Sequence, residues 1–410
     1  MAGCIGETIG HTTRCEYLNP QVRGGRTAAQ TFRILSPLLV CVFGLSISGC
    51  GKDLVLEGAY IEKNGDLAEG LPIRFEQPDL QRLQELRQQE ILDPLVSKSL
   101  DYGSLTNKAE FESILRIKEW VAAQWPHSLP DPYPPWDAII ILDWIRTGRT
   151  GGFCGQYSQV MLQALASFGI PARYVEIGRL TPVDHFVIEV WSNDYDKWVM
   201  LDADFNVHFE RNGIPLGAVE LHDALMNGAT DDVDEILGSV REGHVDPNVL
   251  PFRGIDNFRY VRVMLKADHL SAPDEDPFDR RNDMVEFGDA VSDRLQATAD
   301  GSEFWVNHLP FESTSDRVRF NAKLNQVEAT ITSVAQGQVE MVLKTNYPGF
   351  HGYYLSEVDT SSRKEIRSWR TTGPFVIWKP RPGSRLEVRA IGQTMRAGPP
   401  AIIGTRFVRR

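Results

Sequence analysis

The stretch 151-GGFCGQYSQVMLQALASFGIPARYV-175 places one cysteine, Cys154, among glycines at the start of a segment with helical periodicity. A cysteine is a nucleophile only as its thiolate, and the unpaired N–H groups and positive dipole end of a helix N-terminus favour that form. Gly151, Gly152 and Gly155 would let a substrate backbone approach the sulfur. In the alternative interpretation, Cys154 is a small apolar side chain packed beneath a helix.

A thiolate mechanism needs a base that takes the thiol proton and passes it to a leaving amine. Histidine is the usual residue because its pKa lies near neutrality. Among nine histidines, His185 is best placed, since it opens the strand-like run HFVIEVW one helix and one strand after Cys154. His127, in a proline-rich loop, and His222 and His244, in polar surroundings, are typical of surface residues.

A third group should fix the tautomer of the imidazole, and a predicted hairpin offers a carboxylate. If the polar run 192–195 is the turn between two antiparallel strands, the register places His185 opposite Asp202. Directly opposed side chains have Cβ atoms roughly 4.5–5.5 Å apart, within reach of a His–Asp hydrogen bond. Asp204, two residues further along the same face, is the alternative, whereas strand alternation points Asp184 the other way.

Helices and strands with clear periodicity surround these residues. Apolar residues at helical spacing predict helices, and β-branched and aromatic runs between turn residues predict strands. The predicted helices cover 80–92, 106–125, 137–146 and 156–167, and the predicted strands cover 172–177, 185–191 and 197–202. This order indicates an α+β core in which a helix bearing the cysteine packs on an antiparallel sheet.

Beyond residue 310 the sequence changes to alternating strands separated by turn residues at short intervals. That pattern is typical of an antiparallel β-sandwich of the immunoglobulin or fibronectin kind. The predicted strands cover 318–325, 327–334, 337–346, 352–359, 374–380 and 385–392. The sandwich could bind carbohydrate or protein, and a packing or spacer role is the simpler interpretation.

Three blocks in this order resemble the transglutaminase-like superfamily of papain-like thiol enzymes: GGFCGQYSQVMLQALASFGIPARYV, DHFVIEVW and KWVMLDADFN. The resemblance covers roughly residues 106 to 225 and implies a papain-like core. It implies Cys154 as nucleophile, His185 as base and Asp202 as orienting acid. The chain departs from the commonest pattern after Asp202, where proline often follows the acid, and this leaves Asp204 open as the alternative.

The resemblance implies thiol-dependent acyl transfer or hydrolysis at a glutamine carboxamide or peptide bond through a thioester. Its members are cysteine acyltransferases, proteases and amidases, and the triad does not distinguish among them. The N–H of Cys154 would contribute to an oxyanion hole, with Trp136, Trp144 or Gln156 as the second donor. The alternative is a non-catalytic cell-surface binding or scaffold protein that acts through its β-sandwich.

Four of the five cysteines lie in the first fifty residues, in a segment with the features of an export signal. Arginines precede an apolar run over 34–48 that is short for a membrane span, and Ile-Ser-Gly-Cys50 follows. This pattern resembles a bacterial lipobox, in which cleavage before Cys50 leaves that cysteine to carry lipid; an uncleaved signal anchor is the alternative. We expect an exported cell-envelope protein that meets a bacterial membrane only through this anchor.

The chain of 410 residues has a globular composition, with 42% hydrophobic and 24% charged residues. We predict a signal peptide over 1–49, a tether and helical region over 50–105, a catalytic domain over 106–250, a connecting region over 251–309 and the sandwich over 310–410.

The net charge of -12 and pI near 5.3 argue against nucleic acid or an anionic lipid surface as the main partner. We expect a protein or peptide substrate, or a cell-envelope polymer. No cofactor or metal is expected, because no Cys or His cluster has zinc spacing and DADFN lacks the glycine and final glutamate of an EF-hand loop.

Overall fold

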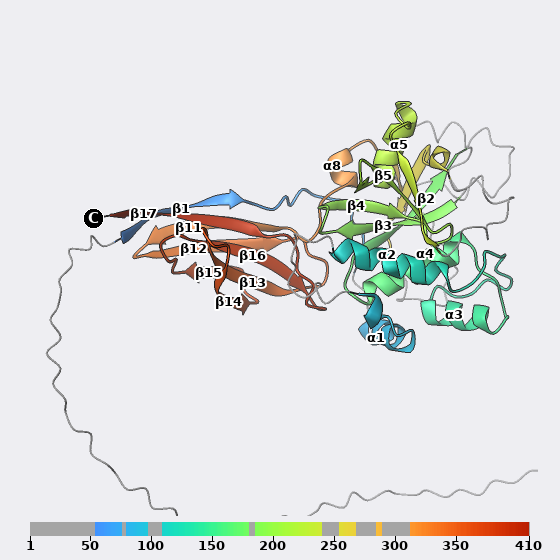
Figure 1. The fold of residues 1–410 in the computed structure, drawn as a ribbon, viewed down its shortest axis with the longest axis horizontal. Coiled ribbons are helices and arrows are strands. Elements are labelled where there is room, and N and C mark those ends of the chain that lie inside the picture. The colour runs from blue at the N-terminus through green and yellow to red at the C-terminus, as the bar shows by residue number, and fades with distance from the viewer. Residues whose placement is uncertain are drawn as a thin grey trace, which may run out of the picture. The chain divides into compact units, whose positions relative to one another are not determined.

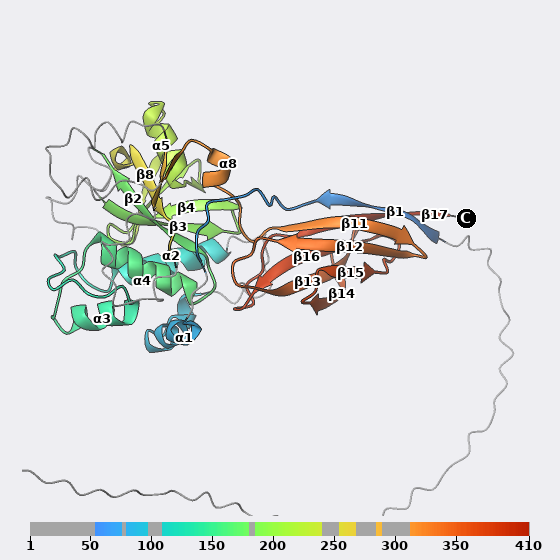
Figure 2. The same cartoon turned by 180° about the vertical axis from the view of Figure 1, so that it is seen from behind.

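The computed structural model describes residues 54–75, 79–96, 109–179, 185–239, 254–267, 284–288 and 312–409. These residues form an α+β core and a β-sandwich, as the sequence predicted (Figures 1 and 2). The predicted signal peptide, including the lipobox and Cys50, lies outside the described residues. Among the helices described, none has the length and apolar character needed to span a membrane.

The core is built around a six-stranded sheet of order β10-β9-β8-β2-β3-β4. Neighbouring strands are antiparallel except for β9 and β10. Side chains alternate between its faces, so Tyr174 and Ile188 enter one hydrophobic cluster while Val175 and Val187 enter another. The strands are β2 (Ala172–Gly178), β3 (His185–Ser192), β4 (Lys197–Leu201), β8 (Tyr260–Met264), β9 (Met284–Phe287) and β10 (Glu312–Thr314).

Helices cover both faces of this sheet (Figure 1). On one face, α4 lies against β2 and β3, with α1, α2 and α3 packed beside it. On the other face, α5 and α8 contribute to the second cluster. The helices are α1 (Leu80–Gln89), α2 (Ala109–Ala122), α3 (Ala138–Arg146), α4 (Cys154–Ala166), α5 (Ala218–Met226) and α8 (Arg317–Phe320), with short 3-10 turns at η1 (Asp93–Leu95) and η5 (Ile255–Asn257).

A small sheet of order β6-β5-β7 continues from the core sheet and follows the turn after β4. The carbonyl and N–H of Asp202 pair with those of Val207, which closes this turn. Asn206 adopts a φ of 55° inside it, a conformation that asparagine tolerates better than most residues. The strands are β5 (Val207–Arg211), β6 (Ile214–Pro215) and β7 (Asp234–Leu237).

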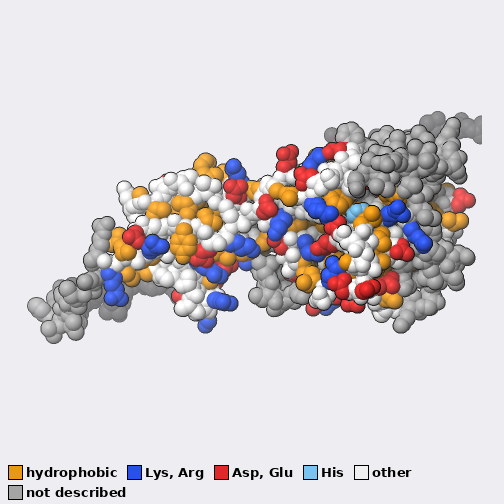
Figure 3. Space-filling model, turned by 90° about the horizontal axis from the view of Figure 1, so that it is seen from above, with side chains coloured by type: hydrophobic (Ala, Val, Ile, Leu, Met, Phe, Trp, Pro, Cys, Tyr) orange, Lys and Arg blue, Asp and Glu red, His pale blue; other side chains and the backbone are white. Residues whose placement is uncertain are grey.

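The sandwich consists of a five-stranded sheet of order β1-β17-β16-β13-β14 and a three-stranded sheet of order β11-β12-β15. Its core includes Leu355, Trp378 and Val388. The face seen in Figure 3 carries acidic and basic side chains interspersed with apolar ones. The strands are β1 (Leu54–Lys63), β11 (Val327–Ala335), β12 (Gln338–Thr345), β13 (Phe350–Asp359), β14 (Glu365–Thr371), β15 (Phe375–Trp378), β16 (Ser384–Gly392) and β17 (Ala401–Arg409).

Three segment predictions are wrong. Residues 54–63, expected within a tether, form β1, which pairs with β17 at an edge of the sandwich. The expected connecting region contains β8 and β9 of the core sheet. The first predicted sandwich strand, 318–325, instead begins in α8, where Phe320 is buried in the core. In each case the partner that decides the conformation is distant in sequence, so local alternation does not report it.

Buried polar contacts join the sandwich to the core. Arg396, between β16 and β17, donates to both carboxylate oxygens of Glu110 on α2, at 2.9 and 2.6 Å. Asn193, in the β3–β4 turn, donates from Nδ2 to the carbonyl of Ala397 at 2.9 Å. The guanidinium of Arg396 and the carboxylate of Glu110 are both buried, so this pair is part of the interior.

Candidate active site

Cys154 is the first residue of α4, as the sequence predicted, and its side chain is 9% exposed. The preceding residue, Phe153, is extended, with a φ of -128°, and its N–H donates to Oε1 of Gln156 at 3.2 Å. The first N–H groups of a helix have no intrahelical acceptor, so they and the helix dipole favour negative charge here. Cys154 is therefore placed where a thiolate is stabilised.

The glycines before Cys154 are needed for packing rather than for substrate approach alone. A Cβ on Gly151 would lie 2.3 Å from the carbonyl oxygen of Leu129, and one on Gly152 would lie 2.5 Å from Nε1 of Trp125. Both neighbours belong to the segment after α2. The N–H of Ser128 also donates to the carbonyl of Gly152 at 2.9 Å. The segment carrying the thiol is thus held tightly against residues 125–129.

His185 opens β3 and lies beside the thiol. Its Nε2 is 2.8 Å from Oδ2 of Asp202, and both side chains are buried. Because a carboxylate only accepts hydrogen bonds, the Nε2–H donates to Asp202, which leaves Nδ1 for other partners. One nitrogen of His185 and the sulfur of Cys154 lie within 4.8 Å of each other, so the thiol and the imidazole can interact electrostatically.

The electrostatic surroundings favour a charged imidazole. Burial by itself would lower the pKa of His185, but the charge of Asp202 and its hydrogen bond outweigh burial. The neighbouring Cys154 acts in the same direction, so the pKa of His185 is raised well above its usual 6.5. A protonated imidazole beside a sulfur is one half of a thiolate–imidazolium pair.

The register that suggested Asp202 is wrong, although the predicted contact is present. In the structure Trp191 lies opposite Trp198, so the turn comprises residues 193–196 and the partners are shifted by two positions. A shift of two keeps every side chain on its face. The ladder ends at Leu201, and the turn that follows carries Asp202 back to His185.

Asp202 is fixed at both of its carboxylate oxygens. Oδ2 accepts from His185, and Oδ1 accepts from the backbone N–H groups of Asp204 and Phe205, at 2.9 and 3.1 Å. The alternative acid, Asp204, has an oxygen within 4.8 Å of the sulfur and of a His185 nitrogen, but its short contact is to another histidine. The geometry therefore favours Asp202 as the partner of His185.

That other histidine is His127, which was expected to be an ordinary surface residue. Its Nδ1 lies 2.9 and 2.8 Å from the two oxygens of Asp204, and its side chain is 19% exposed. His222 is also buried, with Nδ1 2.9 Å from the carbonyl oxygen of Phe258. His244 and Asp184 lie outside the described residues.

A second residue not singled out by the sequence is Lys118, buried on α2. Burial lowers its pKa to about 8, against the attraction of Glu119 and Asp202. Its sequence signal was its place on the inward face of a helix, between the buried apolar residues Ile117 and Val121. Lys118 also lowers the pKa of buried His208, to about 4, after the larger effect of burial.

The three candidates for the second oxyanion donor differ in their surroundings. Nε1 of Trp136 lies 3.4 Å from Oη of Tyr133. Trp144 lies under the guanidinium of Arg149, 3.4 Å from its ring centre. The amide of Gln156 lies at the N-terminus of α4, and its Nε2 has no partner among the described residues.

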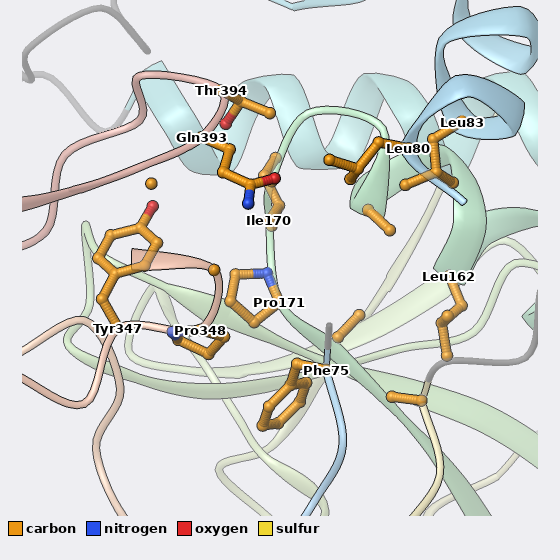
Figure 4. Close-up of a pocket in the computed structure, with 16 residues that line it drawn as sticks. Phe75, Leu80, Leu83, Leu162, Ile170, Pro171, Tyr347, Pro348, Gln393 and Thr394 are labelled. Atoms are coloured by element: carbon orange, nitrogen blue, oxygen red, sulfur yellow. The ribbon is translucent and has the colours of Figure 1, made fainter. Parts of the chain in front are cut away.

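A cavity of about 180 Å³ lies away from this constellation, between the core and the loops of the sandwich (Figure 4). Its lining includes Leu83, Leu162, Pro171, Tyr347 and Thr394. None of the candidate catalytic residues lines it, and its surface is mainly apolar. Cys154, His185 and Asp202 are therefore not part of this cavity.

Comparison with known families matches residues 100–203 to the transglutaminase-like superfamily. No curated protein matches the chain. Among solved structures, the crystal structure of red sea bream transglutaminase is similar with 12% identity and a TM-score of 0.24; the alignment covers 80% of this chain and 58% of that one. This chain thus spans little more than half of that transglutaminase. The matched segment contains Cys154, His185 and Asp202, so the part of the chain that carries the candidate site is similar to the transglutaminase-like superfamily.

Proposed function

We propose that this protein is a cysteine acyltransferase, protease or amidase that acts at a glutamine carboxamide or peptide bond. The observation that carries the proposal is the buried contact of 2.8 Å between His185 and Asp202 next to a thiol at a helix N-terminus. The raised pKa of His185 supports a thiolate–imidazolium pair near neutral pH.

The arrangement supports a two-step reaction. The thiolate of Cys154 attacks the carbonyl carbon, and the resulting oxyanion accepts the N–H of Cys154. The imidazolium of His185 gives its proton to the leaving nitrogen, so the C–N bond breaks and a thioester forms. Neutral His185 then takes a proton from water or an amine as that nucleophile attacks the thioester and displaces the thiolate. Asp202 holds the ring throughout by accepting the Nε2–H.

The substrate class and location extend this proposal. The family acts on protein substrates, so we propose a protein or peptide as the acyl donor. A cell-envelope polymer is the second substrate class that we propose. The sequence also supports export and lipidation at Cys50. Incorporation of labelled fatty acid that disappears in Cys50→Ser would support that anchor, and unchanged incorporation would contradict it.

The first test is the rate of iodoacetamide alkylation against pH. The chain from residue 52 onward contains Cys154 as its sole cysteine, so the readout is specific. We expect wild type to react well below pH 8, and His185→Ala to lose this low-pH reactivity. Asp202→Asn, which removes the charge from the partner of His185, should lose at least about tenfold in rate at pH 6. His351→Ala, at an exposed position of the sandwich, is the matched control.

A thiol that titrates normally in folded wild type would contradict the catalytic proposal. The alternative, a binding protein that acts through its sandwich, has support from β15, where Phe375 and Ile377 are 77% and 62% exposed. A Cys154→Ala variant that keeps every cellular role would favour that alternative. Loss of function with retained folding would favour catalysis.

A further inference from the structure

The second histidine–carboxylate pair, His127 and Asp204, lies beside the thiol but has no part in the reaction described above. Both oxygens of Asp204 are within 2.9 Å of Nδ1 of His127, and the carboxylate is fully buried. One of its oxygens lies within 4.8 Å of the sulfur of Cys154. A buried carboxylate at that distance repels a thiolate and thus opposes formation of the nucleophile.

The position of Asp204 follows from the turn that orients Asp202. The N–H of Asp204 donates to Oδ1 of Asp202 at 2.9 Å, so the two carboxylates are held in one short turn. The turn therefore brings a second negative charge to the site together with the acid that His185 needs. Some neighbouring group must offset that charge if the thiolate is to form.

Several titratable groups lie around this turn, and one of them is in short contact with Asp204. His185 on β3 is engaged by Asp202, and Lys118 on α2 acts on Asp202, with Glu119 and His208 beside it. His127 is the residue in short contact with Asp204. Because the carboxylate only accepts, Nδ1 of His127 carries a proton in that contact whether the ring is neutral or charged.

The segment around His127 is built to hold the ring there. The N–H of Ser128 donates to the carbonyl of Gly152 at 2.9 Å, and Nε1 of Trp125 donates to the same carbonyl at 3.2 Å. Tyr157 of α4 donates its hydroxyl to the carbonyl of Trp125. His127 is thus tied to the residues that precede Cys154.

We propose that His127 is a positioning residue of this site, whose N–H offsets the charge of Asp204 so that the Cys154 thiolate forms beside it. This inference rests on the proposed function, because it concerns the same thiolate. It assigns the two aspartates different tasks: Asp202 orients His185, and Asp204 with His127 sets the local charge. Without His127, the carboxylate of Asp204 would lose its contacts of 2.9 and 2.8 Å with Nδ1 and would still lie within 4.8 Å of the sulfur.

The test is the pH profile of Cys154 alkylation in a double-mutant cycle. We expect His127→Ala to raise the midpoint of the profile by about one pH unit, which corresponds to about tenfold slower alkylation at pH 6. The double variant His127→Ala/Asp204→Asn should return toward the wild-type midpoint, because the carboxylate charge that His127 offsets is gone. His127→Asn, which keeps an N–H donor but cannot become cationic, should lie between wild type and His127→Ala.

A merely structural role for His127 would give a different result. It would slow alkylation at every pH without moving the midpoint, or leave the double variant as impaired as His127→Ala, and either result would overturn the inference. If His127→Ala does not fold, His127→Asn and Asp204→Asn give the same comparison. An ordinary thiol profile in wild type would instead overturn the proposed function, so the two failures are distinguishable.

Discussion

Lys118 is a buried ionisable residue of α2 whose charge interacts with Asp202, the carboxylate that orients His185. It is 2% exposed, and burial lowers its pKa to about 8 from the usual 10.5. A cation in this position attracts Asp202 and so restrains the carboxylate that faces His185. Burying this ammonium group destabilises the folded protein, and the attraction between Lys118 and Asp202 offsets part of that destabilisation.

The pKa of Lys118 predicts how stability depends on pH. Between pH 8 and 10.5 the folded protein binds fewer protons at this residue than the unfolded chain, so its contribution to stability rises with pH. From pH 7 to 9.5 we expect wild type to gain about 2 kcal/mol in free energy of unfolding relative to Lys118→Met. Urea denaturation of both proteins at the two pH values measures this difference.

His185 acts in the opposite direction, but it is present in both proteins. Its raised pKa gives stability that is complete below its unfolded value near 6.5 and is lost as the pH rises through the folded value. Lys344→Met, at an exposed position, is the control and should show no such dependence. A constant difference between wild type and Lys118→Met across this range would contradict the prediction.

At the scale of elements, the approach of the 125–129 segment to the start of α4 limits what can stand before Cys154. A Cβ on Gly152 would lie 2.5 Å from Nε1 of Trp125 and 2.8 Å from Cδ1 of Ile145. These contacts are too short for the surroundings to remain in place. Either the segment or the thiol must move.

We expect Gly152→Ala to lose about 1–3 kcal/mol of stability, as overpacked sites do. Because the displaced segment carries His127, alkylation of Cys154 should also become slower at pH 6. Gly58→Ala, where a Cβ meets nothing within 4 Å, is the matched control. If Gly152→Ala keeps both the stability and the alkylation rate of wild type, the 125–129 segment can move without cost, and the prediction is wrong.

The same elements show which parts of the site the sequence could predict. Periodicity predicted α4 and β3, and the order of blocks predicted the three residues of the site, because these signals are local. The hairpin register was wrong because the four-residue turn comprises 193–196 rather than 192–195: Ser192 still belongs to β3 and pairs with Lys197. His127 was missed because its partner, Asp204, is distant in sequence and nothing in the proline-rich loop signals the contact.

At the scale of the whole molecule, the sandwich is bound to the core through buried charge. Glu110 accepts from Arg396 through both oxygens and also from the N–H of Asn193 at 2.9 Å. Arg396 in turn donates to the carbonyl of Trp191 at 3.3 Å. The pair therefore joins α2, the β3–β4 turn and the sandwich at one buried point.

This arrangement predicts that the core and the sandwich unfold together. Removing one member of a buried ion pair leaves the other charge uncompensated, at a cost of about 3–5 kcal/mol. We expect Glu110→Ala to lower the free energy of unfolding by about that amount while a single transition is retained in differential scanning calorimetry. Asp223→Asn, which removes the exposed ion pair with Arg317, should change it by less than about 1 kcal/mol.

Replacing both Glu110 and Arg396 with apolar residues separates the contribution of their charges to stability from that of their packing. In Glu110→Leu/Arg396→Met neither charge is buried, so part of the loss in Glu110→Ala should be recovered, although Asn193 and Trp191 lose their partners. Two separate transitions in wild type, or a Glu110→Ala effect confined to one of them, would mean that the sandwich is an independent module. A shared transition would instead make the sandwich part of the scaffold that holds α2, and with it Lys118, against the site.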